Sequence, residues 1–160
     1  MSNGNDEKVL LIPKIENGIV IDHIPAGLGV RVLEVLRAWP GLSGEILTLG
    51  CNLQSTRMGC KDMIKLWMPD LPTRLVEHIC LVSPGATVKR IEGYHVAHRY
   101  VAVSPAEIRG LARCRNPACV TNHERDACTR FVATDETHRR FRCVFCERVF
   151  ALEDLELVLT

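Results

Sequence analysis

The chain has 160 residues, a hydrophobic fraction of 47% and a formal net charge of +1 at pH 7. This length suits one ordinary domain or two small ones. The near-zero charge gives no overall field that would attract nucleic acid or a membrane surface, and no apolar run reaches the ~18 residues that a membrane-spanning helix needs. Residues 1–8 are polar and do not resemble a secretory signal peptide, so we expect a cytoplasmic protein that binds neither membranes nor nucleic acid.

Predicted strands and helices alternate along the first hundred residues. Strands are predicted where apolar and β-branched residues cluster, and helices where apolar residues recur every three or four positions. Turn sequences that contain glycine or proline separate these segments. In chain order, we expect strands at residues 9–15 and 19–24, a helix at 27–39, strands at 45–53 and 61–67, a helix that begins at 72 and ends before 84, and strands at 87–91 and 94–103.

These elements have the order βαββαβ, with extra hairpin pairing at the first and last strands, and this order predicts the fold of residues 1–103. Each predicted helix has one apolar stripe, and the predicted strands are largely apolar. Both helices can bury their stripes on one face of a mostly antiparallel sheet. We therefore predict an α+β, ferredoxin-like N-terminal domain.

A second, smaller domain is expected at residues 104–160, where Ser104-Pro105 marks the boundary. We predict a short helix at 105–112 and two strands at 129–134 and 138–143. All four phenylalanines of the chain lie in this part. A module of ~55 residues buries little apolar surface, so aromatic side chains and a bound metal are a reasonable way to hold it together. We expect a small all-β, zinc-ribbon-like domain.

Two cysteine pairs in this part have the spacing of a metal site. Cys114 and Cys119 form a C-x4-C pair, and Cys143 and Cys146 form a C-x2-C pair after a further twenty-three residues. Four thiolates from two such pairs can surround one tetrahedral Zn²⁺ and leave no position for a substrate. The sequence therefore predicts one structural zinc ion per chain, and a function that lies on the surface of the module.

Other ligands and other roles for this site are less well supported. His123 and Cys128 are rival ligands, but neither belongs to a close pair, and a rubredoxin-like iron site would suit two C-x2-C pairs better. Arginines beside the ligands can offset the negative charge of the thiolates or contact nucleic-acid phosphates, as in a zinc-ribbon nucleic-acid-binding regulator. Residues 105–160 contain nine Arg and nine Asp or Glu, which favours charge compensation. The cysteines outside the site, expected to be buried hydrophobes or bystanders, are Cys51, Cys60, Cys80 and Cys128.

The adjacent residues Asp22 and His23 invite a catalytic interpretation. On a strand, however, neighbouring side chains point to opposite faces, so we do not expect Asp22 to orient His23. No motif marks a serine or cysteine nucleophile, and the chain has no P-loop. We therefore predict that the chain by itself is not an enzyme.

Two separate regions of the chain carry a resemblance to a known family. The first region contains the stretches Val20-Ile21-Asp22-His23-Ile24-Pro25-Ala26, Asn52-Leu53, Met58-Gly59, Lys61-Asp62, Ile64-Lys65, Ala86-Thr87-Val88, Arg90-Ile91 and Tyr94. These stretches resemble the regulatory chain of aspartate carbamoyltransferase, and the cysteine-containing tail is similar to the zinc domain of that family in both order and spacing. The similarity runs from about residue 9 to residue 150.

This resemblance implies a non-catalytic regulatory subunit in pyrimidine biosynthesis. The N-terminal domain would bind CTP, UTP or ATP as allosteric effectors, and the zinc domain would dock onto the catalytic chain. Dimers of the regulatory chain would link catalytic trimers. Asn116 and Glu147 match family positions at the interface with the catalytic chain, whereas Ala118 replaces a polar contact of some members.

Several positions match the family's nucleotide contacts. Asp22 and Lys65 match ribose-side contacts, and His23 matches a triphosphate contact. Arg99 stands where the family often has a phosphate-binding lysine. Lys89 replaces a small polar residue, and it can add phosphate affinity or change which effector is preferred. The base pocket is matched by Ile15, Ile91, Tyr94 and Val96, with Ile12 as a neighbouring backbone contact.

Overall fold

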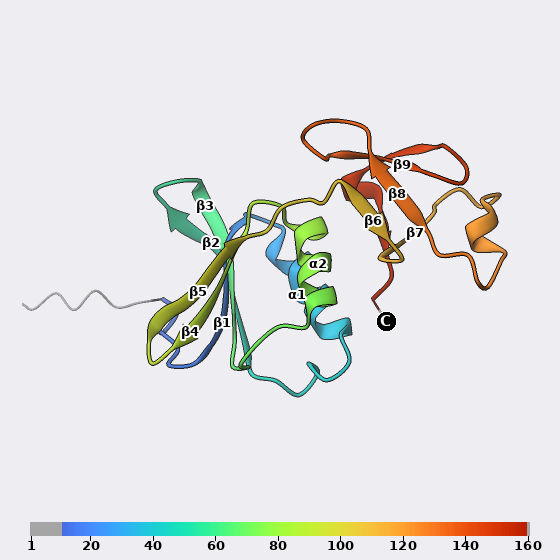
Figure 1. Cartoon of the computed structure of the whole chain (residues 1–160). Coiled ribbons are helices and arrows are strands. Elements are labelled where there is room, and N and C mark those ends of the chain that lie inside the picture. The colour runs from blue at the N-terminus through green and yellow to red at the C-terminus, as the bar shows by residue number, and fades with distance from the viewer. Residues whose placement is uncertain (1–10, 160) are drawn as a thin grey trace, which may run out of the picture.

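The structure is a computed structural model that describes residues 11–159, and this part of the chain forms three antiparallel sheets (Figure 1). A five-stranded sheet has the order β2-β3-β1-β4-β5, a four-stranded sheet has the order β10-β9-β8-β6, and β11 pairs with β7. The elements are β1 Gly18–Pro25, α1 Gly29–Ala38, β2 Leu47–Ser55, β3 Gly59–Leu66, α2 Thr73–Val82, β4 Thr87–Glu92, β5 His95–Val101, β6 Glu107–Arg109, β7 Ala112–Arg113, β8 Arg130–Ala133, β9 Arg140–Cys143, β10 Val149–Ala151 and β11 Glu156–Leu157, with short 3-10 helices at Val120–Asn122 and Leu152–Asp154.

The first module follows the predicted βαββαβ order, with β5 added at one edge of the sheet. Strands β2, β3, β1 and β4 lie in the order of a ferredoxin-like sheet, and each neighbouring pair is antiparallel. Both helices lie on the same face of this sheet, on the side of the second module (Figure 1). The predicted α+β, ferredoxin-like fold is confirmed.

The core of this module lies between the sheet and the two helices. On α1, Val32, Val35 and Leu36 recur at helical spacing and are buried. On α2, Leu75 and Ile79 have the same role. The strands contribute alternating apolar residues to this core, namely Ile19, Ile21, Ile24, Ile64, Leu66 and Val88. Because side chains alternate along a strand, the intervening residues lie on the other face, which has no helix over it.

Asp62 on β3 is a fully buried carboxylate that fixes the start of α1. It accepts hydrogen bonds of 2.9 Å from the backbone N–H groups of Gly27, Gly29 and Asn52. The first N–H groups of a helix have no partner within the helix, and Asp62 supplies one. A Cβ atom at position 29 would lie 2.8 Å from Asp62 Oδ2, so this close approach requires glycine.

Aromatic side chains hold the second module together, as predicted. Phe131 on β8 and Phe141 on β9 are fully buried. The ring of Phe150 meets that of Phe131 edge-on, with the ring centroids 6.2 Å apart. The strands predicted at 129–134 and 138–143 are confirmed as β8 and β9, and this module is all-β apart from its short 3-10 helices.

The helix predicted at residues 105–112 is wrong, because this segment contains strand β6. Ile108 is fully buried and lies opposite Phe131 of β8. Gly110 has a φ of +63°, a backbone conformation that ends the strand and that glycine adopts easily. Pairing with β8 therefore decides the conformation of this segment.

The strand predicted at residues 9–15 is also wrong in its described part. Residues 11–15 form no strand, and residues 9 and 10 lie outside the described residues. Pro13 has no N–H group to donate to a neighbouring strand. Its carbonyl oxygen instead accepts a hydrogen bond from Lys65 Nζ.

Helix α2 joins the two modules. Leu81 belongs to the core of the second module, whereas Leu157 and Leu159 of the C-terminal segment pack against the core of the first. Polar contacts across this junction join His78 Nε2 to Val158 O at 2.9 Å and Arg74 Nη2 to Gly110 O at 2.7 Å. No helix in the described part of the chain has the length and hydropathy to cross a membrane.

Candidate metal centre and effector site

The four predicted cysteine ligands meet at one point in the second module. Cys114 follows β7, Cys119 precedes the 3-10 helix at Val120–Asn122, and Cys143 ends β9. All four Sγ atoms lie within 4.8 Å of one another, with Cys114 and Cys146 at 3.6 Å and Cys119 and Cys143 at 3.9 Å. In a tetrahedral site with Zn–S bonds of ~2.3 Å, the sulfur atoms lie about 3.8 Å apart. The cluster therefore fits one four-coordinate metal ion.

The loops that carry these cysteines are held by side-chain hydrogen bonds and tight turns. Asn122 Nδ2 donates to the carbonyl oxygens of Cys114 and Asn116, both at 2.8 Å. Glu147 has a φ of +61°, and its N–H donates to Cys143 O at 2.9 Å. Of the two residues predicted to contact a catalytic chain, Glu147 is exposed, whereas Asn116 is buried and accepts a hydrogen bond within its own loop.

The acidity of the thiols differs across the cluster. Burial raises the pKa of Cys114 and of Cys143. Burial acts in the same direction on Cys146, but hydrogen bonds from Asn116 and from the backbone N–H of Arg148 lower its pKa to about 7. A metal must therefore displace protons from the buried thiols, and its affinity falls as the pH decreases.

The helix-free face of the five-stranded sheet carries a row of basic residues. Lys65 on β3 lies opposite Val20 on β1, Val20 lies opposite Lys89 on β4, and Lys89 lies opposite Arg99 on β5. Directly paired residues of antiparallel strands point to the same face. Three cations from three strands therefore form one row, which attracts anions that carry several charges.

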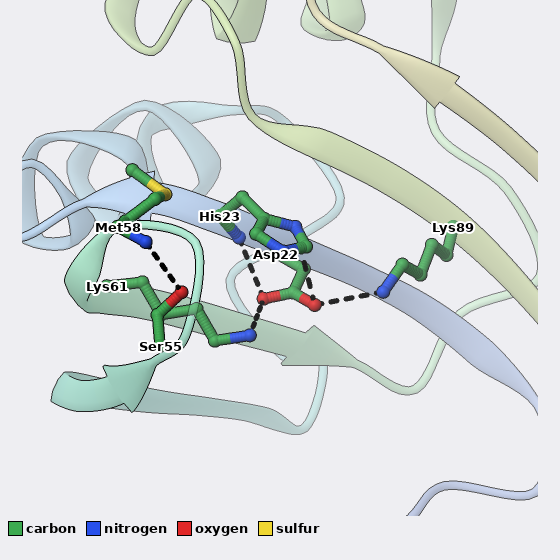
Figure 2. A network of polar contacts seen from close by, with 6 residues as sticks. All are labelled: Asp22, His23, Ser55, Met58, Lys61 and Lys89. Atoms are coloured by element: carbon green, nitrogen blue, oxygen red, sulfur yellow. Dashed lines mark hydrogen bonds and ion pairs between the residues drawn. The ribbon is translucent and has the colours of Figure 1, made fainter.

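Asp22 lies beside this basic row and is the centre of a polar network (Figure 2). The residue is 4% exposed, and its Oδ1 lies 2.7 Å from Lys61 Nζ while its Oδ2 lies 2.9 Å from Lys89 Nζ. The backbone N–H of His23 also donates to Oδ1 at 2.7 Å. Burial alone would raise the pKa of Asp22, but the hydrogen bonds from Lys61, Lys89 and His23 lower it to about 2.

His23 lies close to Asp22, contrary to the expectation from strand alternation. Its Nδ1 is 3.7 Å from Asp22 Oδ2. Strand β1 has an irregular register between Ile21 and Ile24, and His23 has a φ of +56°. Such a bulge re-aims side chains, so the prediction that these two point to opposite faces is wrong. His23 Nδ1 is buried without a hydrogen-bond partner, and burial lowers its pKa although Asp22 opposes this shift.

Some residues of the predicted base pocket gather on the same face. Ile15 and Ile91 pack together with Val20 in a small apolar cluster. Val96 on β5 lies directly opposite Ile91 and is exposed. This apolar cluster adjoins the basic row through Val20, which lies between Lys65 and Lys89.

Three further predicted nucleotide contacts lie outside the apolar cluster, each in different surroundings. Lys65 is buried, its Nζ donates to Pro13 O, and burial lowers its pKa. Tyr94 is 60% exposed in the turn between β4 and β5, with a φ of +67°. Ile12 lies over Gly50 of β2, where a Cβ atom would come within 2.1 Å of Ile12 Cδ1.

Comparison with known proteins assigns both modules to one family. Residues 10–102 match the family described as aspartate carbamoyltransferase regulatory chain, allosteric domain, and residues 106–156 match the metal binding domain of the same regulatory chain. The chain belongs to this family. The curated regulatory chain of Metallosphaera sedula is 39% identical over 138 residues, which cover 86% of this chain and 87% of the relative.

Two other regulatory chains match over a similar extent. That of Pyrococcus abyssi is 38% identical over 146 residues, covering 91% of this chain and 95% of the relative. That of Thermofilum pendens is 38% identical over 153 residues, covering 95% and 94%. The resemblance seen in the sequence is confirmed, and the nucleic-acid-binding alternative is not favoured.

Lys61 belongs to the polar network of this regulatory chain, although it is not among the predicted nucleotide contacts. It lies on β3, four positions before Lys65, and strand alternation counted back from Lys65 places both on the same face. Its contact with Asp22 was not predictable in this way, because it depends on the bulge in β1. The cleft of about 320 Å³ between the two modules contains none of the predicted nucleotide contacts.

Proposed function

We propose that this chain is a non-catalytic, cytoplasmic regulatory subunit of aspartate carbamoyltransferase. Residues 1–103 form the allosteric domain, which binds CTP, UTP and ATP, and residues 104–160 form the domain that docks onto the catalytic chain. The chain pairs with a second regulatory chain. The observation that carries the proposal is the basic row beside Asp22, on a sheet whose sequence matches an allosteric domain.

A nucleoside triphosphate has three chemical parts, and this face offers a partner for each. Lys89, Arg99 and His23, whose Nδ1 makes no hydrogen bond, suit the phosphates, because these need several N–H donors. Asp22 and Lys65 lie nearer the ribose. The apolar cluster, with the predicted contacts Ile12, Ile15, Ile91, Tyr94 and Val96, receives the base.

The metal of the second domain is zinc in this proposal. Four cysteines whose sulfur atoms all lie within 4.8 Å of one another suit Zn²⁺, which has no preferred geometry of its own and binds thiolates tetrahedrally. The ion keeps the two cysteine loops rigid, so that exposed residues such as Glu147 can meet the catalytic chain. Asn116 supports this surface from within its loop.

An effector can influence the catalytic chain only if it binds one of two states of the assembly more tightly than the other. Couplings of this kind are typically about 1–3 kcal/mol, which corresponds to a ~5–150-fold change in affinity. The contacts of α2 with the second module provide a physical connection between the two domains.

Calorimetric titration of the zinc-replete chain with CTP and ATP tests this proposal. We expect saturable binding of both nucleotides, competition between them, and a loss of roughly tenfold in affinity in Lys65→Ala. Arg37→Ala is the matched control, because Arg37 is exposed on α1, on the helix-covered side of the sheet. Absence of nucleotide binding, or equal losses in both variants, would contradict the proposal.

A further inference from the structure

Groups of the chain itself already engage the carboxylate of Asp22. A carboxylate offers about four acceptor positions, and three are filled here by Lys61 Nζ, Lys89 Nζ and the His23 N–H. With the residue only 4% exposed, little room is left for a ribose hydroxyl to approach. The ribose contact that the family resemblance implies therefore requires a change at Asp22.

Among the described residues, Asp22 is the only carboxylate that forms an ion pair with either lysine, so the three groups together keep one positive charge. The ammonium groups of the lysines are mobile point charges on flexible stems, which can turn from one anion to another. A polyphosphate presents the same type of oxygen as the carboxylate, but it carries several negative charges. It can therefore compete with Asp22 for both lysines.

We propose that Asp22 is an internal anion that holds Lys61 and Lys89 until the phosphates of a ligand replace it. This inference rests on the proposed effector site and adds how that site opens. In the exchange, both ammonium groups move from the carboxylate to phosphate oxygens. The released carboxylate then becomes an acceptor for a hydroxyl group of the ligand. Asp22 thus opposes phosphate binding, and the site responds most strongly to ligands with several phosphates.

Inorganic tripolyphosphate is the probe that tests this inference, because it has phosphates but no ribose. In the zinc-replete full chain, Asp22→Asn removes the competing charge and keeps the side-chain shape. We expect tripolyphosphate to bind this variant at least about fivefold more tightly than the wild type, the size of a ~1 kcal/mol ion pair. If Asp22 only contacts ribose, the affinity stays unchanged, and if it only positions the lysines, the affinity falls; either result overturns the inference.

A double-mutant cycle gives a second test that does not depend on one variant. Lys89→Asn should weaken tripolyphosphate binding, and the gain from Asp22→Asn should shrink when Lys89 is absent, because the two residues act on each other. Additive effects would contradict the exchange. The matched control is Glu107→Gln, which removes a carboxylate shared by Arg109 and Arg130 in the other module and should leave binding unchanged.

The outcomes separate this inference from the proposed function. If neither CTP nor tripolyphosphate binds the wild type or Asp22→Asn, both are wrong. If CTP binds but Asp22→Asn does not tighten tripolyphosphate binding, only the exchange is wrong. Fluorescence of Trp39 and Trp67, the two tryptophans of the chain, checks that each variant retains the fold of the first module.

Discussion

The two modules of this chain hold their charged groups in different ways. In the second module, two short loops bring four thiols together beside a core built around two phenylalanines. In the first module, a larger core is complete without an ion, and its helix-free face carries a carboxylate–lysine network between residues up to 67 positions apart. We expect the smaller core to need its polar site in order to fold, because a module of this size buries little apolar surface, whereas the larger core leaves its polar site available for a ligand.

Loss of a metal ligand should give the largest effect and should be confined to the second module. Cys143→Ser removes one buried ligand, and on the order of 10 kcal/mol of metal-binding free energy is coupled to folding in small zinc modules. We expect residues 104–160 to lose their amide dispersion in NMR spectra, while fluorescence of Trp39 and Trp67 stays native. The exposed Cys128→Ser is the control. If the second module of the metal-free variant stays folded, its core does not need the metal, and the contrast drawn between the two modules is wrong.

Removal of Asp62 should be the most damaging polar substitution in the first module. Asp62→Ala leaves three backbone N–H groups without their acceptor, at an expected cost of roughly 3–5 kcal/mol in the free energy of unfolding. Urea unfolding followed by tryptophan fluorescence measures it. Asp62→Asn should be less damaging, because it keeps one acceptor oxygen. Equal stability of the wild type and the alanine variant would mean that the start of α1 does not depend on this carboxylate.

Acid should weaken the Asp22 network by a smaller amount. Its pKa of about 2 in the folded chain lies below the ordinary value of 3.8. The stability that this difference supplies, about 2 kcal/mol at most, is therefore present above pH 4 and is lost as the pH falls through 2. Tryptophan-monitored unfolding between pH 5 and pH 2 should show a shallower pH dependence in Asp22→Asn than in the wild type. Parallel curves would show that Asp22 does not contribute to the pH dependence of stability.

The smallest effect is expected at the junction between the modules. Arg74→Ala removes the hydrogen bond to Gly110 O, which is solvent-accessible and worth about 0.5–1.5 kcal/mol. We expect the two modules to unfold less cooperatively. In protein loaded with Co²⁺ at the cysteine site, tryptophan fluorescence follows the first module and the Co²⁺–thiolate absorption band follows the second, and the two transitions should lie further apart in the variant. Unchanged separation would assign the coupling to the apolar contacts of Leu81 and Leu157.

Features that depend on residues close together in the sequence were predicted correctly, whereas features that depend on contacts between distant residues were not. The helix with Val32, Val35 and Leu36 and the strands β8 and β9 were predicted from patterns within a few residues. The helix predicted at 105–112 failed because pairing of Ile108 with Phe131 outweighed the local pattern. The part of the predicted strand at 11–15 failed because Pro13 cannot take part in a ladder and its carbonyl turns to Lys65 instead.

The amino-acid sequence by itself determined the α+β and all-β fold classes and the cysteine cluster, because these depend on spacing and periodicity, and its matching motifs carried the resemblance to the family. Only the tertiary structure decided that Lys61 and Lys89 share one carboxylate and that His23 turns toward Asp22. These contacts join three strands across a bulge. Register and bulges are set by the packing of the whole sheet, and a shift of one residue would move each of these side chains to the other face.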